Sequence, residues 1–90
     1  MTNKQKENLC KYYRTTSLRL HFAEKDLTYA KTNDEVRTAL QMVDKWSTEV
    51  YGIKSALALM GYKFEKIDDK FNFRLEKAEI TDVNVAIILS

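Results

Sequence analysis

Proline is absent from the 90 residues, and glycine occurs only at positions 52 and 61. Because these two residue types are the strongest interrupters of regular structure, helices can run unbroken over most of the chain. The same scarcity excludes the glycine-rich phosphate loops of nucleotide-binding proteins, since neither GxGxxG nor GxxxxGK[ST] occurs. We therefore expect a few long elements in a single domain, residues 1–90.

The first expected element is a helix over about residues 3–31. Apolar and small side chains recur in this segment at spacings of four and three residues, which is typical of a helix with one buried face. They are Leu9, Tyr13, Thr16, Leu20, Ala23, Leu27 and Ala30.

A second helix is expected over about residues 33–60, beginning at a capping box. The Thr32 hydroxyl can accept from the Glu35 amide, and the Glu35 carboxylate can reach back. The same apolar repeat then continues to Gly61, which suits the position just after a helix. The short connection at Thr32 predicts an antiparallel pair. Gly52, inside this helix, is interpreted as a point of close helix packing, with a hinge as the alternative.

The apolar period then changes to two, which predicts a β-hairpin over about residues 62–76. A loop of two or four residues centred on Asp68 and Asp69 places aromatic side chains on one face. The expected cross-strand pairs are Phe64 with Phe73 and Tyr62 with Leu75.

A third strand is expected over about residues 82–89, where β-branched residues alternate with others; a short helix is the alternative. The predicted fold class is α+β, with two long antiparallel helices packed on a small antiparallel β-sheet in the order ααβββ. An exposed strand at residues 83–89 can pair with another chain, which is one reason to expect a homodimer.

Few residues point to catalysis or to metal binding. Cys10 and His21 lie about 16 Å apart along the first helix, so they cannot share one metal ion without further ligands. The remaining carboxylates are interpreted as turn and surface charges. They are Asp68, Asp69, Glu76, Glu79 and Asp82. We expect no enzyme activity, no cofactor, no metal and no small-molecule substrate.

The formal charge of +2 is unevenly distributed, because residues 1–31 carry seven basic and three acidic side chains. A second stripe on the first helix mixes these cations with apolar groups, opposite the first stripe. It is either buried by the sheet or exposed as a partner-binding surface. Its candidate residues are Lys11, Arg14, Leu18, Phe22, Lys25 and Tyr29. Trp46, on the second helix, is either a core residue or an interface anchor.

The sequence thus predicts a small protein-interaction or regulatory module that uses its helical pair and self-associates. The alternative is a nucleic-acid-binding regulator that uses the cations of the first helix. Those cations are Lys4, Lys11, Arg14, Arg19 and Lys25. No apolar run suits a signal peptide or a membrane span, so we expect a cytoplasmic protein. Eleven lysines against four arginines, together with the absence of proline, suggest an AT-rich bacterial or phage genome, as for an accessory protein of a phage or mobile element.

Overall fold

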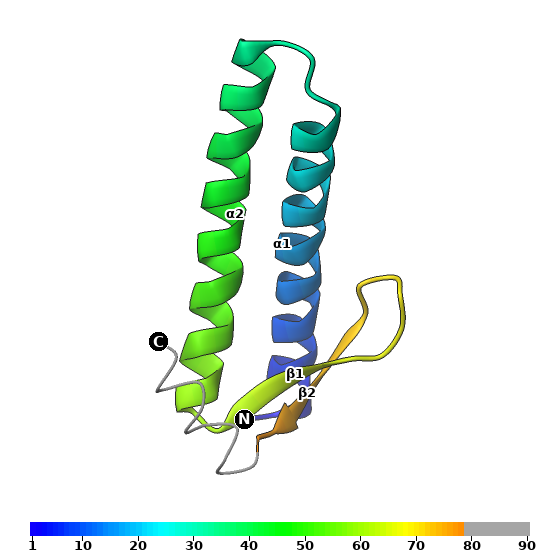
Figure 1. The fold of residues 1–90 in the computed structure, drawn as a ribbon. Helices are drawn as coiled ribbons and strands as arrows, with labels where there is room; N and C mark the ends of the chain where they lie inside the picture. Colours follow the sequence, from blue (N-terminus) through cyan, green and yellow to red (C-terminus); the bar gives the residue numbers. More distant parts are fainter. Residues whose placement is uncertain (79–90) are drawn as a thin grey trace.

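The computed structural model describes residues 1–78. Helix α1 (Asn3–Tyr29) and helix α2 (Asn33–Leu59) lie side by side and antiparallel, and strands β1 (Tyr62–Lys66) and β2 (Phe73–Lys77) form an antiparallel two-stranded sheet beside them (Figure 1). The predicted α+β class with a helical hairpin is therefore confirmed. The predicted strand at 82–89 lies outside the described residues.

The turn between the helices depends on the side chains that the capping pattern singled out. The Thr32 hydroxyl accepts a hydrogen bond from the Glu35 amide at 3.1 Å, as predicted. The Glu35 carboxylate, however, accepts from the Lys31 amide at 2.8 Å and not from that of Thr32. Because the Lys31 amide donates to Glu35 and not to a carbonyl of α1, Lys31 is not part of that helix. Helix α1 ends at Tyr29, two residues before the predicted end, and the backbone of Ala30 is extended.

The two glycines have different roles. Gly61 has a positive φ of 85°, and its amide donates to the Ala58 carbonyl at 3.0 Å, so it ends α2 as predicted. Its own carbonyl accepts from the Ala78 amide at 2.8 Å, which ties the end of α2 to the end of the hairpin. Gly52 is exposed, and a Cβ placed there would meet no atom of another described segment within 4 Å. The predicted close packing at Gly52 is therefore wrong.

The hairpin register differs from the predicted one. Phe64 pairs with Leu75 and Lys66 with Phe73, so each residue of β1 meets a partner two positions later than expected. A shift of two residues leaves every side chain on its original face. The aromatic face of the hairpin is therefore as predicted, although the pairs are not.

The reason for the shift is a loop longer than either of the expected lengths. It spans residues 67–72, and the Asp68 carboxylate accepts hydrogen bonds from the Lys70 amide at 2.8 Å and from the Asn72 side chain at 2.8 Å. Phe71 has a positive φ of 62°, which is unusual for a bulky residue. These local bonds stabilise a wider turn than Asp68 and Asp69 alone would form.

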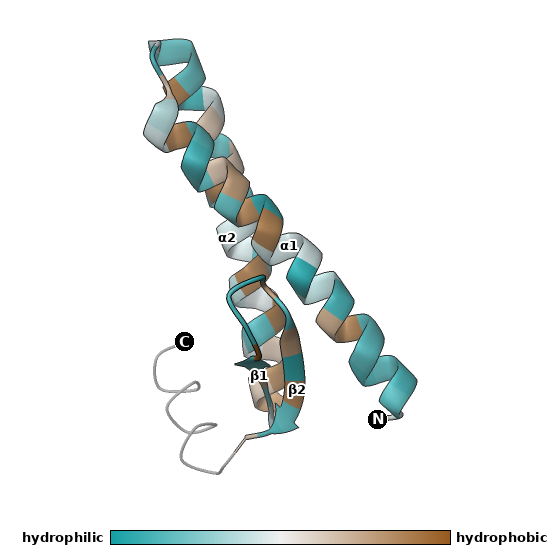
Figure 2. Cartoon of the chain, turned by 90° about the vertical axis from the view of Figure 1, so that its right-hand side faces the viewer, coloured by the Kyte–Doolittle hydropathy of each residue, from teal (hydrophilic) through white to brown (hydrophobic). Residues whose placement is uncertain are grey.

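The core lies where the hairpin meets the lower half of the helical pair. Tyr13 is 6% exposed, and its ring stacks on Phe64 and meets the edge of Phe73. Further along the pair the buried residues are small, namely Ala23 and Ala39. Figure 2 shows that the hairpin lies beside the lower part of the pair, whereas the upper part extends beyond it. The result is an elongated shape of 45 × 28 × 19 Å.

Candidate interaction surfaces

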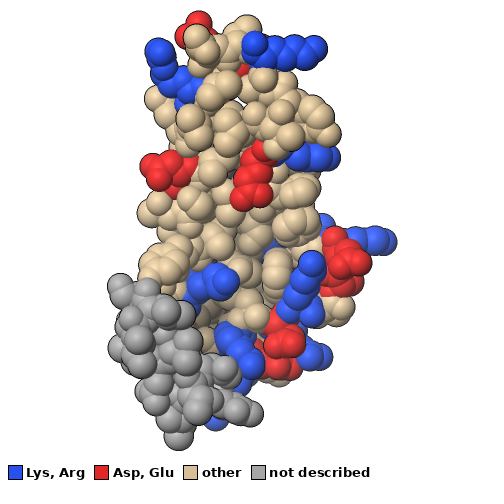
Figure 3. Space-filling model, viewed as in Figure 1, with Lys and Arg blue, Asp and Glu red and all other residues tan. Residues whose placement is uncertain are grey.

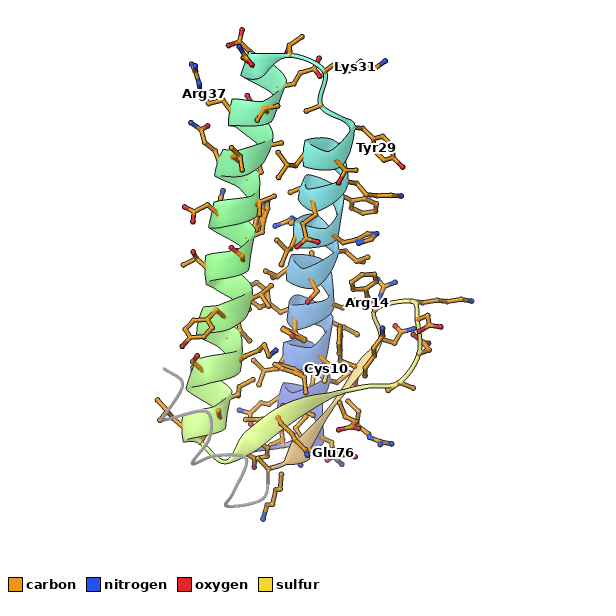
Figure 4. All side chains as sticks on the ribbon, in the orientation of Figure 1. Cys10, Arg14, Tyr29, Lys31, Arg37 and Glu76 are labelled. Atoms are coloured by element: carbon orange, nitrogen blue, oxygen red, sulfur yellow. The ribbon has the colours of Figure 1, made fainter. Side chains whose placement is uncertain are left out.

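The lower part of the second stripe on α1 lies under the hairpin loop. The Arg14 guanidinium donates to the Lys70 carbonyl at 3.4 Å, close to the loop as Figure 4 shows. Further along the same helix, the His21 ring lies 5.1 Å from the ring of Phe71. These contacts hold the loop against α1, so this part of the predicted partner surface packs within the chain. Lys11 is exposed and forms a 3.2 Å ion pair with Glu7 on the same helix.

The upper part of the stripe is exposed. Phe22 is 57% exposed and Tyr29 is 73% exposed. Tyr29 points away from α2, as Figure 4 shows. Lys25 lies between these two rings on the same helical face and is also exposed, while Leu18 is half-buried. We refer to Leu18, Phe22, Lys25 and Tyr29 as the outer stripe.

Trp46 is half-buried and lies between two cations. The guanidinium carbon of Arg19 is 4.9 Å from the indole ring centroid, and the Lys45 ammonium is 4.7 Å from it. Both lie within the range of a cation–π interaction. Within residues 1–78, neither cation forms an ion pair with a carboxylate. We refer to Arg19, Lys45 and Trp46 as the tryptophan cluster.

The tryptophan cluster and the hairpin lie on opposite flanks of α1. Positions two residues apart on a helix point about 200° apart, and His21 contacts the hairpin loop. Arg19 therefore points away from that loop, toward Trp46. On this flank, no described residue of the hairpin has a ring or cation–π contact with the cluster.

An open acidic groove lies on the pair near the turn. Its volume is about 450 Å³, and it is lined by one side chain of α1 and several of α2. They are Asp26, Asp34, Glu35, Thr38, Ala39 and Met42. In the described part of the chain, none of the three carboxylates is within ion-pair distance of a lysine or arginine. The groove is therefore an anionic surface with an apolar floor.

On the face of the molecule that carries the hairpin, many of the charged side chains belong to the hairpin. Figure 3 shows basic and acidic side chains together over the strands and their loop, while larger uncharged areas run along the helices. Several of the hairpin charges neutralise each other, as Arg74 does with Glu76 at 2.6 Å and Lys66 with Asp69 at 3.7 Å. The hairpin thus presents paired charges and no field of one sign.

The reactive side chains stay apart in the described structure. Burial raises the pKa of the Cys10 thiol, an effect partly offset by a hydrogen bond from the backbone of Leu75. A thiol with a raised pKa is a weaker nucleophile at neutral pH because less thiolate is present. Within residues 1–78, no group of three His, Cys, Asp or Glu side chains is arranged to hold a metal ion.

Neither described helix is long and apolar enough to cross a membrane. No protein-family model matches the chain, and neither curated proteins nor solved structures give a significant match. Function is therefore inferred from the surfaces described above.

The structure divides the residues that the sequence grouped together. The predicted partner-binding set separates into Arg14, which contacts the hairpin loop, Lys11, which pairs with Glu7 on α1, and the outer stripe. The sequence analysis did not predict the acidic groove. The sequence signal closest to it is the seven-residue spacing of Arg19 and Asp26, because this spacing places Asp26, which lines the groove, on the same flank of α1 as Arg19.

Proposed function

We propose that this chain is a small protein-interaction module without catalytic chemistry of its own, and that its helical pair is the binding surface. The observation that carries the proposal is the exposure of large aromatic side chains on the outer stripe, where Phe22 and Tyr29 are more than half exposed. Aromatic side chains are enriched at protein interfaces, and tyrosine is enriched among the residues that dominate the binding energy.

The surrounding structure supports this role. The hairpin reaches only as far as His21 along α1, so Phe22, Lys25 and Tyr29 have no covering layer among the described residues. Two of these positions, Phe22 and Tyr29, are seven residues apart and so share one helical face. An extended apolar stripe of this kind fits a groove or a second helix on a partner.

The proposal is tested by affinity capture from the native host with matched variants. The bait Phe22→Ser/Tyr29→Ser removes the aromatic groups of the outer stripe. The control Leu40→Ser/Tyr51→Ser removes similarly exposed groups from α2. We expect a partner that binds the wild-type chain and the control, and not the outer-stripe variant. A partner profile that is the same for all three baits would contradict the proposal.

A nucleic-acid-binding regulator is the second candidate, because the first 31 residues carry an excess of four positive charges. Of the five cations considered for this role, Lys11 is paired with Glu7, Arg14 with the hairpin loop and Arg19 with Trp46. Lys4 and Lys25 remain exposed and carry no ion pair among residues 1–78. Fluorescence anisotropy with labelled DNA and RNA at low salt tests this candidate, since phosphate contacts weaken steeply as salt rises. Absence of binding at low salt would eliminate it.

A further inference from the structure

The flank of the helical pair opposite the hairpin exposes side chains of both charges together with an apolar one. Arg19 and Asp26 of α1 and Lys45 of α2 are exposed, and Met42 of α2 is 43% exposed. Among the described residues, this flank is therefore open to a partner.

The flank that carries the tryptophan cluster also carries complementary charges. Arg19 and Asp26 are seven residues apart on α1, so they point in nearly the same direction and lie about 10 Å apart along the helix axis. Arg19 belongs to the tryptophan cluster and Asp26 to the acidic groove. One end of this flank is thus cationic and aromatic, and the other end is anionic.

Met42 lies between these two regions. It lines the acidic groove, is 43% exposed, and is one helical turn from Trp46. A methionine side chain is flexible and apolar, so it can adapt to another apolar surface. Glu49 lies one helical turn beyond Trp46, so Trp46 separates it from the groove.

We propose that a second copy of this chain docks on this flank, so that the tryptophan cluster of each copy lies over the acidic groove of the other. A two-fold axis between Arg19 and Asp26, passing near Met42, brings Arg19 of each copy to Asp26 of its partner. Such an arrangement is closed and self-complementary, because the same patch serves both subunits. Arg19 and Lys45, and the carboxylates of the groove, form no ion pair within residues 1–78, and in this arrangement they neutralise each other across the interface.

This inference rests on the proposed function, because it takes the helical pair as the interaction surface, and it specifies a different flank from the outer stripe. The test uses the full chain and exchanges charges at two exposed positions. Arg19→Glu places like charges opposite Asp26 at both symmetry-related contacts, and Asp26→Lys places them opposite Arg19. We expect each variant alone to weaken dimerisation about tenfold or more.

The decisive measurement is an equimolar mixture of the Arg19→Glu and Asp26→Lys variants. In the mixed dimer the two substituted side chains face each other with opposite charges, and the native Asp26 of one chain meets the native Arg19 of the other. Sedimentation velocity and light scattering report the masses. We expect the mixture to recover the wild-type dissociation constant. Arg37→Glu is the matched control: it makes the same charge change at an exposed position of α2 that points away from α1, and it leaves the dimer unchanged. Circular dichroism verifies that each variant is folded.

Three results would overturn the dimer proposal. They are a wild-type chain that stays monomeric at high micromolar concentration, single variants that dimerise like the wild type, and weakened variants that do not recover on mixing. None of these results affects capture through Phe22 and Tyr29, so failure of the dimer is distinguishable from failure of the proposed function.

Discussion

The rings of Tyr13 and Phe64 are stacked with their centroids 3.9 Å apart and their planes within 8° of parallel. This contact joins the lower half of α1 to the first strand, and Phe73 of the second strand meets the same tyrosine ring at 4.7 Å. Burial raises the pKa of the Tyr13 hydroxyl, with a partial offset from a hydrogen bond donated by the Ser17 side chain. One side chain therefore connects both strands of the hairpin to the helical pair.

Tyr13→Ala should be strongly destabilising because it removes this shared contact and leaves a cavity. We expect a loss of about 3 kcal/mol in the free energy of unfolding, measured by urea denaturation. Tyr29→Ala is the control, since Tyr29 is mostly exposed, and should change the same quantity by less than ~0.5 kcal/mol. Equal effects of the two substitutions would contradict the assignment of Tyr13 to the core.

The two glycines should respond to alanine with opposite signs. Gly52→Ala adds a methyl group in open space on a helix and should stabilise the chain by about 1 kcal/mol, because alanine has the higher helix propensity. Gly61→Ala forces an L side chain into a positive φ and should destabilise it by about 1 kcal/mol or more. Thermal denaturation of both variants gives the comparison. A destabilising Gly52→Ala would show that this position needs glycine after all.

The hairpin loop should depend on the ionised form of Asp68. Hydrogen bonds from the Asn72 side chain and then from the Lys70 amide hold the pKa of Asp68 below its ordinary value of 3.8. Because the pKa of Asp68 is lower in the folded chain than in the unfolded one, the ionised carboxylate stabilises the loop at pH values above the unfolded-state pKa. This contribution is lost as the pH falls through the folded-state pKa.

An acid titration followed by NMR measures this effect at the Lys70 amide. We expect its chemical shift to titrate with a midpoint below pH 3.8, and we expect Asp68→Asn to abolish the transition. Asp69→Asn, which removes the neighbouring carboxylate, should leave it in place, because Asp69 pairs with Lys66 and not with this amide. A midpoint at or above pH 3.8 would contradict the prediction.

Cys10 should be less reactive in the folded chain than in the unfolded one. Burial raises the pKa of the Cys10 thiol above its ordinary value of 9.0. The neutral thiol therefore contributes to the free energy of unfolding at pH values below the unfolded-state pKa. This contribution is lost as the pH rises through the folded-state pKa. The rate of alkylation by iodoacetamide at neutral pH should rise when urea is added. The signal is unambiguous because the sequence contains one cysteine. Equal rates with and without urea would contradict this interpretation.

The pattern of the helices could be predicted from the sequence, because caps and apolar periodicity are local properties. Thr32 begins α2 and Gly61 ends it, as their chemistry predicts. The register of the hairpin could not be predicted in the same way. The pairing depends on how the Asp68 side chain satisfies the amides of its own loop, and alternation of period two fixes the faces of a strand but not its partner.

The candidate surfaces were predictable in part. Phe22, Lys25 and Tyr29 were identified as a stripe opposite the core, and their exposure follows from how far the hairpin reaches. A helical projection, however, cannot say which flank of α1 the hairpin covers. Arg14 therefore belongs to an internal contact. Arg19 and Asp26 lie at opposite ends of a flank that the described part of the hairpin does not cover, and the pattern of cations alone did not reveal this flank.

The short reach of the hairpin also sets an order of local unfolding. Every described aromatic contact between the sheet and the helices lies at or below His21, whereas the end of the pair near Thr32 is held by small residues such as Ala23 and Ala39. The turn end can therefore open without disturbing the aromatic core. Its amide hydrogens should exchange with solvent ahead of those around Tyr13, and binding in the acidic groove, at that same end, should slow their exchange most.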